Sequence, residues 1–219
     1  MKIFVKKNGL SLALFGCFIA MEVGLSLVGL RQYNAEQATH GQVLLSYSEY
    51  LTSPAFLEAT MENWESEFLQ MFAYVVFTAF LYQQGSSESK TIGKVEDVDI
   101  DPRTQRDLAN TPWPVRRGGL ILKLYENSLS LALFLLFLAS FFLHAVSGAQ
   151  LHSEQQVQHG ERAISVWEYL VTSQFWFESL QNWQSEFFSI GLMVVLSIFL
   201  RQRGSPESKP VAMPHSESP

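Results

Sequence analysis

Two ionisable side chains, Glu22 and His144, lie inside stretches of sequence that are otherwise apolar. A charged group within a membrane-spanning helix is costly and usually faces the protein interior. When the chain is aligned with itself at an offset of 119 positions, His144 falls at position 25, one helical turn from Glu22. Two hypotheses follow: a proton relay or cation gate in the membrane, or a buried polar pair that fixes helix packing. We favour the packing pair.

A second candidate is the motif Asn-Trp-x-Ser-Glu-Phe, which occurs twice. On a helical wheel its Asn and Glu share one face and its Trp adjoins them, whereas the neighbouring acids Glu58, Glu62 and Glu65 fall elsewhere and are not repeated. A face shared by both copies either packs against another helix or lines a binding site, and packing is the preferred interpretation because Trp often anchors helices at the membrane surface. The shared positions are Asn63, Trp64, Glu67, Asn182, Trp183 and Glu186.

Two His-Gly pairs begin at His40 and His159, with carboxylates nearby in the sequence. Imidazole and carboxylate groups together can bind a divalent metal. The spacing matches no recognised metal-ligand pattern. We therefore expect a turn at each pair and no bound metal or cofactor.

Catalytic motifs are missing from the sequence. It has no Gly-rich phosphate loop, no nucleophile elbow and no zinc-protease His-Glu-x-x-His. The net charge of -6 provides no basic face for nucleic acid, and the single cysteine, Cys17, lies in an apolar run. We expect neither an enzyme nor a nucleic-acid-binding protein.

Four apolar stretches position these residues. Residues 10–30 and 129–149 each contain 21 residues, which cover about 30 Å as a helix, the thickness of a bilayer core. Residues 68–82 and 187–200 are shorter, but each continues a helical pattern that begins near Phe56 or Phe175. The sequence predicts an all-α integral membrane protein with four transmembrane helices.

The chain contains an internal repeat. Residues 8–90 align without a gap with residues 127–209, and 33 of the 83 pairs are identical. Because each copy holds two spans, both copies enter the membrane in the same direction, as two parallel two-helix repeats. The predicted segments are a first repeat (1–90), a flexible cytoplasmic linker (91–117), a second repeat (118–209) and a disordered tail (210–219).

Basic residues predict the orientation. Of the 15 Lys and Arg residues, only Arg31 and Arg162 lie outside the N-terminus, the linker and the C-terminus, so 13 of the 15 lie within these three segments. Basic residues near the ends of spans are retained in the cytoplasm. Both termini are therefore expected to be cytoplasmic.

The duplicated motifs Asn-Trp-x-Ser-Glu-Phe and Gly-Ser-x-Glu-Ser-Lys resemble those of a bacterial membrane-protein family of unknown function, and the resemblance covers most of the chain. It implies a location in the bacterial inner membrane and brings no activity, substrate or cofactor. We expect a non-enzymatic interaction or envelope component whose partners are the lipid bilayer and a membrane protein or a second copy of the chain. The alternative is a small proton or cation channel or transporter that uses Glu22 and His144.

Overall fold

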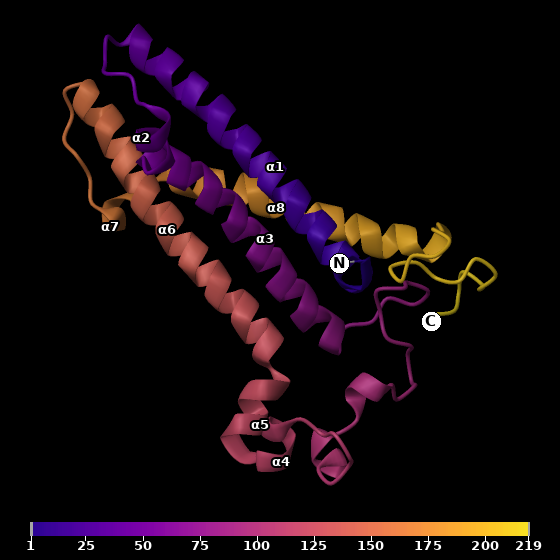
Figure 1. Ribbon diagram of the computed structural model, residues 1–219. Helices are drawn as coiled ribbons and strands as arrows, with labels where there is room; N and C mark the ends of the chain where they lie inside the picture. Colours follow the sequence, from indigo (N-terminus) through magenta and orange to yellow (C-terminus); the bar gives the residue numbers. More distant parts are fainter. Residues whose placement is uncertain (1, 219) are drawn as a thin grey trace. The chain divides into compact units, whose positions relative to one another are not determined.

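The computed structural model describes residues 2–218 as helices and loops, with no strand in that range. Four helices are long: α1 (Lys2–Thr39), α3 (Pro54–Phe80), α6 (Ser128–Gln158) and α8 (Ser173–Phe199) (Figure 1). The all-α prediction is confirmed, and the helices expected to begin near Phe56 and Phe175 begin at Pro54 and Ser173. The short helices are α2 (Tyr47–Leu51), η1 (Asp97–Asp99), η2 (Pro102–Gln105), α4 (Trp113–Arg117), α5 (Gly119–Glu126) and α7 (Val166–Tyr169).

The chain divides into two compact units. The first contains residues up to Met61 together with Leu143–Thr172, and the second contains Glu62–Phe142 together with the residues from Ser173 onward. Helices α1, α2 and α7 therefore belong to the first unit, and α4, α5 and α8 belong to the second. Helices α3 and α6 contribute residues to both units.

Two helices, α1 and α6, are long and apolar enough to cross a membrane. Only 6% of the most apolar window of α1 and 17% of that of α6 is buried, so their apolar side chains face outward. Helices α3 and α8 do not meet the same test, because their apolar parts, residues 68–80 and 187–199, contain only 13 residues each. Thirteen residues cover about 20 Å as a helix, which is less than a bilayer core. Of the four spans expected from the sequence, the structure supports two.

Helices α1 and α6 both end at the predicted His-Gly turns. Gly41 and Gly160 adopt φ angles of 66° and 80°, a left-handed conformation that glycine adopts without steric cost. The amide of Gln42 donates to the carbonyl of Gln37 at 2.9 Å, and the same bond joins Glu161 to Gln156 at 2.9 Å. This pattern terminates a helix by satisfying its last carbonyls. The turn prediction is confirmed at both pairs.

The short helices α2 and α7 are built alike. Ser46 and Glu49 form a reciprocal capping box at the start of α2, and Ser165 and Glu168 form one at the start of α7. This arrangement satisfies amides that a helix start leaves without partners. The register that it fixes places Tyr50 and Tyr169 within the buried interior, 4% and 0% exposed.

Two glycines receive these buried tyrosines. The ring of Tyr50 lies against Gly29 of α1, and the ring of Tyr169 lies against Gly148 of α6. A Cβ atom added at Gly148 would lie 2.6 Å from Cε1 of Tyr169, which is closer than side-chain atoms approach. Glycine, which has no Cβ atom, is thus required at positions 29 and 148 for α2 and α7 to pack on the long helices.

The segments predicted as a linker and a tail contain local structure. Helices η1, η2 and α4 lie within residues 91–117, and Lys90 forms an ion pair with Asp99 at 2.6 Å. Nζ of Lys209 donates to three backbone carbonyl oxygens of the tail, those of residues 214, 215 and 217. The flexibility of both segments stays a prediction.

Candidate functional site

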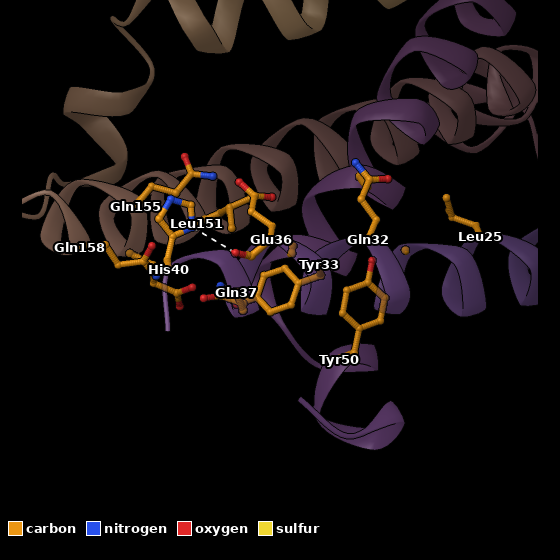
Figure 2. Close-up of a pocket in the computed structure, with 14 residues that line it drawn as sticks. Leu25, Gln32, Tyr33, Glu36, Gln37, His40, Tyr50, Leu151, Gln155 and Gln158 are labelled. Atoms are coloured by element: carbon orange, nitrogen blue, oxygen red, sulfur yellow. Dashed lines mark hydrogen bonds between the residues drawn. The ribbon is translucent and has the colours of Figure 1, made fainter. Parts of the chain in front are cut away.

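A polar cavity of about 230 Å³ lies in the first unit, beside the ends of α1 and α6 (Figure 2). Helix α1 lines the cavity with residues 32, 33, 36 and 37, which recur at helical spacing, and residue 40 follows in the turn after α1. Helix α6 provides residues 151, 154, 155 and 158 in the same way. Leu25 and Gly29 border it toward the apolar part of α1, and Tyr50 enters from α2. The polar lining residues are Gln32, Tyr33, Glu36, Gln37, His40, Tyr50, Glu154, Gln155 and Gln158.

The electrostatic character of the cavity is negative. Its lining contains the carboxylates of Glu36 and Glu154, and none of the described residues that line it is Lys or Arg. Both acids lie beyond the apolar stretches 10–30 and 129–149. Burial raises the pKa of Glu154. Burial also raises the pKa of Tyr33, with further increases from the nearby charges of Glu154 and then Glu36, so both carboxylates act on the same hydroxyl.

Aromatic rings form one wall of the cavity. The ring of Tyr33 lies 5.9 Å from that of Tyr50, centroid to centroid, with the planes tilted by 48°. Tyr50 in turn packs on Phe56 at 5.6 Å. Figure 2 shows the two tyrosine rings side by side below Gln32. Tyr50 is thus in contact with aromatic rings on two sides.

The two histidines of the His-Gly turns meet in the first unit. Their ring centroids are 6.3 Å apart, and the rings are nearly perpendicular at 70°. Nδ1 of His40 lies 3.0 Å from the carbonyl oxygen of Glu36, as the dashed line in Figure 2 marks, and Nδ1 of His159 lies 2.8 Å from the carbonyl oxygen of Gln155. Within the described range, these imidazoles and the nearby carboxylates form no group of three ligand atoms within 4.8 Å of one another. The weak metal hypothesis for His40 and His159 therefore gains no support from their geometry.

Both ionisable residues of the apolar stretches belong to the first unit. Glu22 is partly buried, and one of its carboxylate oxygens lies 3.4 Å from the hydroxyl of Thr60, which donates to it. His144 lies on α6 and is fully buried. Their direct pairing stays a prediction, and the observed partner of Glu22 is a hydroxyl group of α3.

In the second unit, polar side chains of α3 and α8 form direct contacts. Nε1 of Trp183 donates to the carboxylate of Glu65 at 2.9 Å, and Glu65 is fully buried. The side-chain amide of Asn182 donates to Glu62 at 2.5 Å, and that of Gln181 donates to the same carboxylate at 3.4 Å. Two residues of the face predicted from the motif, Asn182 and Trp183, thus pack against acids that the helical wheel placed on another face.

The other motif residues make contacts of different kinds. The ring of Trp64 lies 6.3 Å from that of Phe68, and the hydroxyl of Ser66 donates to the carbonyl of Asn63. The side-chain amide of Gln70 donates to the carbonyl of Glu186 at 3.2 Å. Glu67 lies on the exposed side of α3.

A sequence signal for the acids of α3 exists in hindsight. Glu62 and Glu65 correspond, at the offset of 119, to Gln181 and Gln184. An acid in one copy and an amide in the other form a donor and acceptor pair when the two copies face each other. Gln181 and Glu62 are equivalent positions that touch, and so are His159 and His40 in the first unit.

Comparisons with known proteins give one match. No curated protein and no solved structure matches the chain. The family model of a domain of unknown function, DUF6766, matches residues 1–219. The chain, with its all-helical architecture and two apolar helices, belongs to the DUF6766 family.

Proposed function

We propose that the chain is a non-enzymatic multi-pass protein of the bacterial cytoplasmic membrane that acts through contacts at the polar ends of its helices. The observation that supports a membrane location is the exposure of apolar side chains on α1 and α6, for example 76% for Leu10, 68% for Phe15 and 62% for Leu129. Exposed apolar surface costs about 25 cal/mol per Å² in water and nothing comparable in lipid. Lipid is therefore the solvent that suits these helices.

The apolar ends of α3 and α8 are proposed as the other two spans. Each is short, at 13 helical residues, and crosses the membrane if the bilayer thins locally or if polar flanking residues reach its surface. Membrane proteins tolerate such a mismatch at modest cost. With four spans, the basic N-terminus, linker and C-terminus all lie in the cytoplasm, as the distribution of Lys and Arg predicts.

The two halves are proposed as copies of one unit, and within each compact unit the copies are proposed to meet in a local two-fold arrangement. In a two-fold arrangement, equivalent residues meet at the axis. His40 with His159, and Glu62 with Gln181, are such pairs, one in each compact unit. The matched capping boxes and the matched glycine–tyrosine contacts support the same relation.

The interaction role follows from the polar parts of the helices. Polar groups that are buried in protein and joined by hydrogen bonds specify one packing, and Glu65 with Trp183 is such a pair. Beyond the apolar stretches, α1 and α6 expose carboxylates and amides around the cavity of the first unit. This surface is suited to a partner on the outer side of the membrane, either a second protein or a second copy of the chain.

Cysteine accessibility tests the membrane placement. In a Cys17→Ser background, single cysteines are introduced as Gln42→Cys, Ala163→Cys and Asn110→Cys. A membrane-impermeant maleimide should label positions 42 and 163 in intact cells and position 110 only after the membrane is opened. Labelling of position 110 in intact cells, or recovery of the protein in the soluble fraction without detergent, would overturn the proposal.

Ion flux tests the channel alternative. The observation that favours this alternative is the partly buried Glu22 inside an apolar stretch. Under the proposed role, neither the wild type nor Glu22→Gln supports pH-dependent conductance in proteoliposomes. A conductance in the wild type that Glu22→Gln abolishes would establish the relay instead.

A further inference from the structure

We propose that the cavity beside the ends of α1 and α6 binds a primary ammonium group, with Glu36 and Glu154 as its anionic contacts. The cavity combines a negative lining, a set of hydrogen-bond acceptors and an aromatic wall in about 230 Å³. Each of these three properties restricts the chemistry of the ligand.

Charge selects a cation. The described residues that line the cavity include two carboxylates and neither Lys nor Arg. Arg162, the basic residue of the loop that follows α6, is bound to Glu168 at 2.6 Å and so does not neutralise the cavity. Burial raises the pKa of Glu154, since it disfavours the charged form of the carboxylate. A cation bound beside Glu154 would favour the charged form.

Hydrogen bonding selects a primary ammonium over other cations. Such a group has three N–H donors, and the cavity presents carboxylate oxygens together with the amide oxygens of glutamines from both helices. A quaternary ammonium lacks N–H groups and leaves these acceptors unused. A bare metal ion requires several ligand atoms closer together than the described side chains here provide. The half-buried ring of Tyr33 lines the cavity and adds an aromatic surface beside a bound cation.

Size and position define two sources of the ammonium group. The cavity is smaller than the roughly 300–1,000 Å³ of pockets for drug-sized ligands, so the ligand is small. Leu25 and Gly29, which border it, belong to the apolar stretch 10–30, so the cavity begins where the proposed span ends. An ammonium group at this level comes either from a phosphatidylethanolamine headgroup or from a free amine. The lipid source depends on the proposed membrane placement, whereas the free amine does not.

Calorimetry on the full-length protein in detergent tests the proposal. Ethanolamine is titrated into the protein, and ethylene glycol is titrated in a separate control experiment. Ethylene glycol has a hydroxyl in place of the ammonium group and so lacks the charge. A saturable heat of binding is expected with ethanolamine and not with ethylene glycol. The variant Glu36→Gln/Glu154→Gln should weaken binding by at least about tenfold, because a charge-assisted hydrogen bond contributes that much to affinity. Glu161→Gln, which removes an acid of the loop that follows α6 and lies outside the cavity lining, should bind like the wild type.

Nanodiscs separate the two sources. The protein is reconstituted with phosphatidylglycerol alone or with added phosphatidylethanolamine, and bound lipid is counted by native mass spectrometry. Retention of phosphatidylethanolamine that the double variant loses assigns the site to the headgroup. Binding of ethanolamine without lipid selectivity assigns it to a free amine.

Three results would overturn the ammonium site. The first is the absence of both saturable heat with ethanolamine and retention of phosphatidylethanolamine. The others are equal binding of ethanolamine and ethylene glycol, and unchanged binding in the double variant. The ligand comparison uses the wild type, so it stands even if a variant fails to fold. If the proposed membrane placement is wrong, the cysteine labelling reveals it, and the ethanolamine titration still tests the ammonium site.

Discussion

The hydrogen bond between Trp183 and Glu65 offers a direct measure of how polar contacts stabilise the second unit. Trp183→Phe keeps an aromatic ring beside Phe137, whose centroid lies 6.2 Å from that of Trp183, and removes only the N–H donor. Glu65 is fully buried, so water cannot replace the lost donor. A hydrogen bond to a carboxylate contributes about 1.5–3 kcal/mol. For a chain of this length, each kcal/mol corresponds to roughly 2–4 °C in Tm, so Tm should fall by about 3–12 °C.

Thermal unfolding in detergent, followed by far-ultraviolet circular dichroism, gives the Tm of each variant. Trp167→Phe is the matched control because Trp167 is 74% exposed, and its Tm should equal that of the wild type. Glu65→Gln retains an acceptor oxygen and introduces the residue that stands at the equivalent position 184, so it should cost less than Trp183→Phe. If Trp183→Phe and Trp167→Phe unfold at the same temperature, the contact contributes nothing and the packing argument fails.

Two further predictions concern the first unit. Gly148→Ala should lower the free energy of unfolding by about 1–3 kcal/mol, and with it Tm, because the new methyl group would overlap Tyr169. Gly16→Ala is the control and should leave Tm unchanged, because a Cβ atom there meets no atom within 4 Å. Equal effects of the two substitutions would refute the steric argument. At the start of α7, the side chain of Arg162 and the amide and hydroxyl of Ser165 lower the pKa of Glu168 to about 2 from the ordinary 4.5. A lowered pKa stabilises the folded state above about 4.5 and ceases to do so as the pH falls toward 2, so the difference in Tm between the wild type and Glu168→Gln should shrink over that range. A difference that stays constant with pH would show that the carboxylate charge is not responsible.

The long helices were predictable because their signals are local. Hydrophobic periodicity placed the starts of α3 and α8 within two residues of the observed ones, Pro54 and Ser173, and the His-Gly pairs correctly marked the ends of α1 and α6. The number of spans was harder to predict. Whether a helix spans the membrane depends on the length of its apolar part. The apolar parts of α3 and α8 are shorter than a bilayer core by about 10 Å.

The cavity could not be predicted because its lining comes from segments far apart in the sequence. Glu36 and Glu154 are ordinary exposed acids when each helix is considered alone, and only the approach of α6 to α1 gives them a shared environment. The acids of α3 were missed for a related reason. The comparison of the two copies considered only positions that correspond in the alignment. The contact between α3 and α8 joins Glu65 to Trp183, which do not correspond.

The meeting of Glu62 with Gln181 shows what a single chain can do that two identical chains cannot. Identical subunits place the same residue type on both sides of a symmetry axis, so an acid there would face an acid and be repelled. When both halves belong to one polypeptide, each side of the axis can change independently, and a carboxylate can face an amide that donates to it. Covalent linkage thereby turns a position of electrostatic conflict into an attractive contact.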